Sequence, residues 1–440
     1  MAEWPDVALG DLVDIKHGFA FQGEFFRDDP PGDVLLTPGN FAIGGGFKGD
    51  KLKYYVGLVP EEYVLSAGDL IVTMTDLSKE GDTLGYPAIV PSSSDRFLHN
   101  QRIGKVLGLG SRADMRFLYY LLCTREYRNE VLASATGTTV KHTAPSRITA
   151  FRLALPPLPT QQGIAEILRA LDDKIELNRR MNQTLESMAR AIFRSWFVDF
   201  DPVVAKAEGR QPFGMSADVA ALFPSALIRS QAGQIPSGWS TVNVGSVTEI
   251  KRQGINPGEF PNESFDHYSI PAFDESRMPK RESGASIKSN KFIVPPQTVL
   301  LSKLNPRFPR VWLPEIDSIH RPVCSTEFIV SEPKPGVSRE FMYCLFGSLA
   351  FAESFSGLVT GTSGSHQRVK PEDLLHMKVI QPPQALTAHF AQLVGPMLKR
   401  NSALTEESIT LSRMRDTLLP KLMSGELRIR DAEKLVGTHV

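Results

Sequence analysis

The residues of this 440-residue chain that could do chemistry are clustered hydrogen-bond donors and cations. Asn100, Gln101 and Arg102 stand together after a turn rich in serine and aspartate, and the segment 302–310 places lysine, arginine and asparagine between prolines. These side-chain types suit hydrogen bonds to base edges in a DNA groove or to phosphate. The alternatives are a strand start that points to solvent in the first cluster and a solvated turn in the second. The candidate contacts are Asn100, Gln101, Arg102, Lys303, Asn305, Arg307 and Arg310.

Two Gly/Thr-rich loops and two strand ends supply further candidates. The loops begin at Thr136 and Thr360, at matching places in the two halves of the chain. Their backbone N–H groups and cations could hold phosphate, or the loops could only connect a domain to the helix that follows. The residues concerned are Thr138, Thr139, Lys141, His142, Ser363, His366, Arg368 and Lys370 in the loops, and Lys16, His17, Lys251 and Arg252 at the ends of the first expected strands.

Motifs for catalysis do not occur in the sequence. The segment Asp29-Pro30-Pro31-Gly32 is similar to the Asp-Pro-Pro-aromatic motif of adenine methyltransferases, but Gly32 cannot stack on a flipped base. No Walker A, HExxH or GxSxG sequence is present. We therefore expect a non-catalytic chain that binds neither a metal nor a cofactor.

Composition narrows the class of protein. Lysine plus arginine and aspartate plus glutamate both number 49, so the chain cannot hold DNA by bulk charge alone. No apolar run is long enough to span a membrane, and the N-terminus has no secretory pattern. The three cysteines, Cys123, Cys324 and Cys344, form no ligand cluster or disulfide framework. We expect a cytoplasmic protein in a reducing compartment, without membrane contact.

The elements that would position the candidate residues occur twice. The stretch 4–16 (WPDVALGDLVDIK) resembles 239–251 (WSTVNVGSVTEIK), and each opens a region of short apolar runs broken by Gly and Pro. Further matched pairs are the strand–turn–strand patterns 64–73 and 292–302, the short helices 117–122 and 341–346, and the proline-terminated strands 155–157 and 380–383. The chain therefore contains two copies of one mixed α/β domain.

A long helical pattern follows each proline pair. Apolar residues alternate by four and three along both segments, which is a heptad seam. We expect the two helices to pair; the alternative is that each packs on its own domain. Asn178 and Asn401 stand at seam positions, where a buried polar group fixes register at a cost in stability. The seam residues are Ile164, Leu168, Leu171, Ile175, Asn178, Asn182, Leu185, Ile192, Trp196, Phe390, Val394, Met397, Asn401, Leu404, Leu411, Leu418 and Leu422.

The order of segments predicts an α+β chain in which two pseudo-symmetric mixed α/β domains are joined by two long helices. Pairing could run either way; we expect an antiparallel coiled coil, because it gives the two domains equivalent settings. A helix of about 33 residues would be ~50 Å long, which suits two reading heads over major grooves that recur every ~34 Å. The expected parts are a domain at 1–157, a central helix at 158–200, an ordered connector at 201–235, a second domain at 236–383, a distal helix at 384–425 and a tail at 426–440.

Several segments outside the mixed domains indicate a family. The stretches 155–202 and 415–427 (RDTLLPKLMSGEL), together with 207–210 (AEGR) and 235–239 (IPSGW), resemble the central and distal conserved regions and linker of type I restriction-modification specificity subunits. The resemblance extends over nearly the whole chain. It implies that each mixed domain is a target-recognition domain for one half of a bipartite DNA target, and that the paired helices set the spacing. Ser408 and Arg415 depart from a clean apolar seam.

The resemblance also implies an assembly. Two methylation subunits would bind the paired helices and methylate adenine with S-adenosylmethionine, and two restriction subunits that use ATP and Mg would complete a DNA-cutting pentamer. The chain itself would bind double-stranded DNA and no cofactor. The alternatives are a protein-binding coiled-coil scaffold without sequence-specific DNA recognition, and an enzyme with an unrecognised nuclease or methyltransferase centre.

Overall fold

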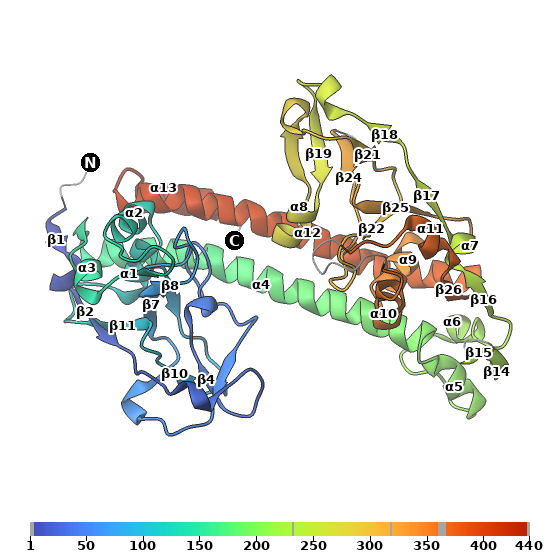
Figure 1. Ribbon diagram of the computed structural model, residues 1–440, viewed down its shortest axis with the longest axis horizontal. Coiled ribbons are helices and arrows are strands. Elements are labelled where there is room, and N and C mark those ends of the chain that lie inside the picture. The colour runs from blue at the N-terminus through green and yellow to red at the C-terminus, as the bar shows by residue number, and fades with distance from the viewer. Residues whose placement is uncertain (1–3, 231–232, 317–318, 360–366, 438–440) are drawn as a thin grey trace. The chain divides into compact units, whose positions relative to one another are not determined.

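The computed structural model describes residues 4–230, 233–316, 319–359 and 367–437 (Figure 1). The chain divides into two compact units: unit 1 is Met1–Ile175 with Thr410–Val440, and unit 2 is Glu176–Ile409. Each unit contains one mixed domain and a stretch of both long helices. The duplication predicted from the sequence is therefore a duplication of structure.

Unit 1 contains two sheets that share a core. Inner sheet 1 is antiparallel, with the order β2 (Val13–His17), β11 (Ile103–Gly108), β7 (Leu70–Thr73) and β9 (Pro87–Ile89). Outer sheet 1 has the order β3 (Phe26–Arg27), β5 (Lys53–Tyr55), β4 (Asp33–Leu35), β10 (Phe97–Leu98) and β6 (Val64–Leu65). Its β4 and β10 run parallel, and the other neighbours run antiparallel.

Both faces of inner sheet 1 are covered, so β7 is buried at every position. Side chains alternate between the two faces of a strand. Ile71 belongs to the core shared with Val34 and Phe97 of outer sheet 1, whereas Leu70 and Val72 belong to the core on the helical side. The helices on that side are α1 (Met115–Leu122), α2 (Arg125–Ala133) and α3 (Pro145–Thr149). A two-stranded ladder of β1 (Asp6–Ala8) and β13 (Arg152–Ala154) closes the domain.

Unit 2 repeats this plan. Inner sheet 2 has the order β17 (Thr248–Lys251), β25 (Phe328–Pro333), β22 (Val299–Ser302) and β23 (Val311–Trp312). Outer sheet 2 has the order β18 (Gly254–Ile255), β21 (Lys291–Ile293), β24 (Arg321–Ser325), β19 (Ser264–Tyr268) and β20 (Lys280–Ser283), with β19 and β24 parallel. The helices are α7 (Val244–Val247), α8 (Ile270–Ser276), α9 (Arg339–Phe346), α10 (Leu349–Ser356) and α11 (Pro371–His376), and β16 (Ser240–Asn243) pairs with β26 (Lys378–Gln381).

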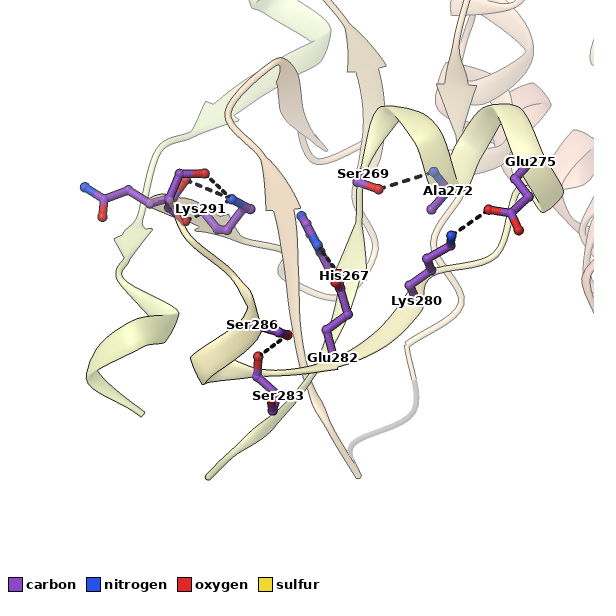
Figure 2. A network of polar contacts seen from close by, with 11 residues as sticks. His267, Ser269, Ala272, Glu275, Lys280, Glu282, Ser283, Ser286 and Lys291 are labelled. Carbon is purple, nitrogen blue, oxygen red and sulfur yellow. Dashed lines mark hydrogen bonds and ion pairs between the residues drawn. The ribbon is translucent and has the colours of Figure 1, made fainter. Parts of the chain in front are cut away.

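A polar network lies on outer sheet 2 (Figure 2). His267 Nδ1 lies 2.5 Å from a carboxylate oxygen of Glu282 on the neighbouring strand. The Lys291 ammonium donates to the backbone and hydroxyl oxygens of Ser289, at 2.9 and 2.6 Å. Burial lowers the pKa of both His267 and Lys291, although Glu282 acts in the opposite direction on each.

The two long helices, α4 (Leu158–Phe197) and α12 (Gln384–Met423), run antiparallel within each unit. In unit 1 the end of α12, in red in Figure 1, packs against the start of α4. In unit 2 the end of α4 packs against the start of α12. The buried seam residues are Ile164, Leu168, Leu171, Leu411, Leu418 and Leu422 in unit 1, and Asn178, Trp196, Phe390, Val394 and Leu404 in unit 2. Half-buried seam residues are Ile175, Asn182, Leu185, Ile192, Met397 and Asn401. The antiparallel coiled coil predicted from the sequence is confirmed.

The asparagines of the seam bond across it. Asn178 Nδ2 donates to a Glu407 carboxylate oxygen at 3.1 Å, and Asn182 Nδ2 donates to Thr405 Oγ1 at 3.0 Å. Asn401 Nδ2 donates to the backbone oxygen of Asn182 at 3.1 Å. A shifted register would leave these buried and half-buried groups without their partners, so the layer favours one alignment of the helices.

The two departures from an apolar seam also have partners. Ser408 Oγ donates to the backbone oxygen of Leu404 on its own helix, at 2.8 Å. The Arg415 guanidinium donates to the Asp172 carboxylate at 2.7 Å, and the Tyr120 hydroxyl donates to the same carboxylate at 2.8 Å. Burial acts to lower the pKa of Arg415, but the carboxylates of Asp172 and Asp416 together outweigh it and the pKa is raised. This network ties α1 to both long helices of unit 1.

Segments flanking the long helices are ordered. The connector contains α5 (Asp201–Ala207), α6 (Ala217–Ala221) and a hairpin of β14 (Leu227–Ser230) and β15 (Gly233–Pro236). The segment 426–440, expected as a tail, contains α13 (Ile429–Val436), which buries Ala432 and Val436 in the core of unit 1. A Cβ at Gly163 would lie 2.7 Å from Ile429 Cδ1, so a side chain there would have to displace the end of Ile429. Across the described residues, no helix combines the length and apolarity that a membrane span requires.

Candidate nucleic-acid interface

Three loops of unit 1 converge beyond the end of β7, and we call them loop cluster 1. They are the hairpin loop 74–86, the turn 99–102 and the Gly/Thr loop 136–143. The Met74 N–H donates to the Arg102 backbone oxygen at 2.9 Å, and the Thr143 N–H donates to the Met74 oxygen at 2.9 Å. Within the cluster β8 (Thr75–Asp76) pairs with β12 (Lys141–His142).

Loop cluster 2 has the same backbone connections. It comprises the hairpin loop 303–310, the turn 325–327 and the segment 367–370. The Lys303 N–H donates to the Glu327 oxygen at 3.0 Å, and the Val369 N–H donates to the Lys303 oxygen at 3.1 Å. Leu304 and Arg368 form a bridge where β8 and β12 pair in unit 1. By these hydrogen bonds Met74 corresponds to Lys303, and Arg102 corresponds to Glu327.

The predicted cluster Asn100–Arg102 is the turn that precedes β11. Asn100 is buried, and its side-chain oxygen accepts from the Arg102 N–H at 3.2 Å. A Cβ at Gly18 would lie 2.1 Å from the backbone oxygen of Asn100, so the backbone at Gly18 packs closely against this turn. Asn100 therefore shapes the turn, and the side chains of Gln101 and Arg102 are exposed.

The four candidates of hairpin loop 303–310 have different surroundings. Arg310 forms a two-pronged ion pair with Asp274, at 2.6 and 2.8 Å, and thereby anchors the loop to α8. Asn305 adopts a left-handed conformation with φ of 48°, and its side-chain oxygen is buried without a partner. Arg307 is exposed and Lys303 half-buried, and among the described residues neither forms an ion pair. The loop thus offers Arg307 and Lys303 to a ligand.

The first Gly/Thr loop is a tight hairpin. Thr136 and His142 exchange backbone hydrogen bonds at 2.9 and 2.8 Å, and His142 Nδ1 lies 3.1 Å from Thr75 Oγ1. Gly137 has φ of +93°, and a Cβ there would lie 2.0 Å from the Val140 oxygen, so the turn requires glycine. Thr138 and Thr139 are exposed at its end, and Lys141 is half-buried.

The second Gly/Thr loop is described only in part. Ser363 and His366 lie outside the described residues. The Arg368 guanidinium pairs with both oxygens of Glu327, at 2.8 to 3.1 Å, and this contact raises its pKa. Lys370 is exposed and precedes α11.

The basic strand ends are mostly paired. The Lys16 ammonium donates to the backbone oxygen of Glu62 at 3.0 Å and lies over the Tyr63 ring, whereas the neighbouring His17 is exposed. Lys251 pairs with Glu332 at 2.7 Å. Arg252 pairs with Glu372 of α11.

Cations without an ion pair gather on the loop clusters. Those among the candidates, within the described part of the chain, are Arg102, Lys141, Lys303, Arg307 and Lys370. Phosphate contacts need cations that are not already neutralised. The loop clusters therefore offer cations that a DNA phosphate could contact, even though the whole chain is neutral.

Sequence reasoning missed the acidic and apolar members of the clusters. Glu327 is the partner of Arg368, and its matched place in unit 1 holds Arg102. Leu77 and Phe308 are exposed on the two hairpin loops. Alignment of the two halves of the chain through their strands could have indicated the first pair; the exposure of the apolar residues had no sequence signal. In the described part of the chain no group of three or more His, Cys, Asp or Glu could hold a metal.

Each unit thus joins a mixed domain and its loop cluster to part of the long-helix pair, which is the organisation that the sequence predicted for a DNA-specificity protein. Residues 1–187 match the family model described as type I restriction modification DNA specificity domain. The resemblance to the specificity subunits of type I restriction-modification systems that the sequence indicated is confirmed.

Relatives extend the match beyond the first unit. The type I restriction enzyme HindI specificity subunit of Haemophilus influenzae is 26% identical over 97% of this chain and 100% of its own length. The EcoBI specificity subunit of Escherichia coli is 30% identical over 42% of this chain and 36% of its own length. The fold is similar to the crystal structure of the S subunit from M. genitalium, with a TM-score of 0.59 and 16% identity over 95% of this chain and 96% of that one.

Proposed function

We propose that loop cluster 1 and loop cluster 2 each read one half of a bipartite, asymmetric DNA target. The observation that carries this proposal is one backbone arrangement used twice with different polar side chains. The matched positions hold Arg102 and Glu327 in the two turns, and His142 and Arg368 in the bridged strands. Base pairs are distinguished by their patterns of donors and acceptors, so two clusters that differ in this way would select different sequences.

The helix pair would act as spacer and as docking surface. Its asparagine layer favours one register, and a fixed register sets a fixed gap between the half-sites. The outward faces of the helices carry many charged side chains, including the Glu176–Arg179 and Glu176–Arg180 ion pairs. We propose that two methylation subunits bind this helix pair.

Catalysis would reside in those partners. We propose that the methylation subunits bind S-adenosylmethionine and methylate adenine within each half-site, and that two restriction subunits using ATP and Mg complete a cleaving pentamer in the cytoplasm. The present chain would supply double-stranded DNA recognition and hold no cofactor.

Methylome mapping tests the proposal. The chain is expressed with its neighbouring methylation subunit in a host without DNA methylation, and modified adenines are mapped. The expected result is methylation of a split motif with a fixed gap. An assembled complex that binds S-adenosylmethionine but shows no motif would favour a protein-binding scaffold instead.

A domain exchange tests which unit reads which half. Residues 1–157 are replaced by the corresponding domain of a relative with a different target. One half-site should change while the other half and the gap remain. Simultaneous change of both halves would contradict independent reading.

A further inference from the structure

Hairpin loop 303–310 presents an aromatic ring beside a cation. Phe308 is 55% exposed, although phenylalanine is among the residue types most often buried. The Arg307 guanidinium lies 4.9 Å from the centre of the Phe308 ring. A single exposed apolar side chain is ordinary on a protein surface, so its meaning depends on the loop that carries it.

The loop that carries Phe308 is held at several points. The Ser302 N–H donates to the Arg310 oxygen at 2.9 Å, and the Phe308 N–H donates to the Asn305 oxygen at 3.0 Å. The ion pair between Arg310 and Asp274 fixes the end of the loop. A side chain on a loop that is already ordered loses little conformational entropy on binding. Phe308 can therefore contact a ligand at a low cost in conformational entropy.

The matched loop of unit 1 carries a second exposed apolar residue. Leu77 is 64% exposed and follows Asp76, whose carboxylate accepts from the backbone N–H groups of Ser78 and Thr83 at 2.6 and 2.5 Å. Burial acts to raise the pKa of Asp76, but the hydrogen bond from the Thr83 hydroxyl, together with those from the two backbone N–H groups, outweighs it and the pKa is lowered. Thus the matched hairpin loops of the two units are held by different contacts, and each loop exposes an apolar residue to solvent.

Packing does not account for this coincidence, since most of each side chain lies outside the core. The two loops differ in length, sequence and anchoring, yet each exposes an apolar residue. Phe308 lies beside Arg307, and Leu77 follows Asp76, whose backbone pairs with that of Lys141. In loop cluster 2 those cations are Arg307 and Lys303, which lack ion pairs within the described residues.

We propose that Phe308 is a wedge residue, whose ring enters the half-site read by unit 2 and packs against the bases at one step while Arg307 contacts the adjacent phosphate. Leu77 makes the corresponding apolar contact in the other half-site. Apolar side chains inserted at base steps unstack them and bend the duplex. Pyrimidine–purine steps unstack most easily, so the wedge adds sequence preference without a hydrogen bond to a base edge.

This inference rests on the proposed function and is tested on the target that methylome mapping yields. The chain is assembled with its methylation subunits and bound to duplexes in which 2-aminopurine replaces one adenine at a time in each half-site. Apart from the adenine that is methylated, which is flipped out of the stack in either case, fluorescence should rise at one step of unit 2's half-site. Phe308→Ala should abolish that rise and lower the affinity about tenfold, whereas Phe308→Leu should retain part of both.

Salt dependence separates the wedge from charge. Phe308→Ala removes no charge, so the slope of log affinity against log salt should stay unchanged. Arg307→Ala should reduce the slope by about one. Phe213→Ala is the matched control, because Phe213 in the connector is fully exposed and far along the chain from both loops.

Two failures are distinguishable. If the wild-type complex methylates its motif but Phe308→Ala binds and fluoresces like Phe213→Ala, the wedge is overturned and the proposed function stands. If the wild-type complex shows no sequence preference, the proposed function fails and the wedge fails with it.

Discussion

The two loop clusters have the same backbone connections and opposite electrostatics at one matched position. In unit 1 the turn before β11 exposes Arg102, which has no ion pair among the described residues. In unit 2 the turn before β25 places Glu327 there, and its carboxylate neutralises Arg368. Hydrogen bonds between backbone groups do not depend on side-chain identity, so a scaffold held by them can accept different reading residues.

The ends of the helix pair differ as well. In unit 1 the seam is aliphatic and includes the Arg415–Asp172 ion pair. In unit 2 it is aromatic, with the Phe390 ring 5.3 Å from Phe197 and 6.0 Å from Phe193. Counted from the start of each long helix, Ala189 occupies the place of Arg415. Both units thus keep a packed seam, but unit 1 packs it with aliphatic side chains and an ion pair, and unit 2 packs it with aromatic rings.

The largest expected effect concerns the aromatic end. Phe390→Ala should cost unit 2 about 3–5 kcal/mol, because it removes a fully buried ring and leaves a cavity. Hydrogen exchange should accelerate in α9 and the start of α12 while α1 stays protected. Leu393→Ala, on the exposed face of the same helix, is the control and should change little. Equal loss of protection in both units would show that they unfold together.

Acidification should weaken unit 1 next. Burial lowers the pKa of His99 to about 4, with Lys16 and Lys105 adding to the shift, and its Nε2 lies 2.9 Å from the Ile103 oxygen. The folded state binds fewer protons than the unfolded state below the usual pKa of 6.5. Stability from neutral His99 is therefore full above pH 6.5 and is lost as the pH falls toward 4, by about 2 kcal/mol at pH 5.

Hydrogen exchange of β10 and β11 between pH 5 and pH 7.5, corrected for intrinsic rates, measures this loss. His99→Gln removes the titrating group and should flatten the profile. A profile for unit 1 that is unchanged in His99→Gln would assign the acid sensitivity to another group.

A smaller effect is expected at the ion pair of unit 1. Asp172→Leu should cost about 1–2 kcal/mol, because Arg415 and the Tyr120 hydroxyl both lose their partner. Adding Arg415→Ala, the residue that unit 2 has at this place, should restore part of the loss. Chemical denaturation of the two single variants and the double variant gives the coupling energy; additive effects would mean that the pair contributes nothing.

The smallest effect is expected at the matched turns. Arg102→Ala should weaken DNA binding by roughly 1 kcal/mol, with a lower salt slope, because one phosphate contact is lost. Glu327→Ala should act in the opposite direction, since it removes a negative charge from the loop cluster. Binding titrations at two salt concentrations measure both, and the same sign for both variants would contradict the comparison.

The sequence alone predicted the features that depend on periodic spacing or on repeated segments. The heptad spacing from Ile164 to Trp196 predicted a paired helix, and the tryptophan-led repeats at 4–16 and 239–251 predicted two copies of one domain. Both signals depend on the local geometry of a helix or a strand, which a sequence reports directly. The clustered hydrogen-bond donors of 100–102 and 303–310 lie in a turn and a loop of the structure.

The sequence did not indicate which cations are already neutralised by an ion pair. Arg310 and Arg368 looked equivalent to Arg307 in sequence, yet the first two are held by Asp274 and Glu327. The partner residues lie 36 and 41 positions away in the chain. Pairing over such separations depends on which strands become neighbours, and local patterns carry no information about that.

The sequence by itself therefore determined the duplication, the two long helices and the segments rich in hydrogen-bond donors, because each depends on residues that are close together or regularly spaced along the chain. Only the tertiary structure decided which residues face each other across the seam, the backbone hydrogen bonds that join three loops into one cluster, and the exposure of Phe308 and Leu77. These depend on contacts between residues far apart in sequence, whose free energy arises only when the core has formed.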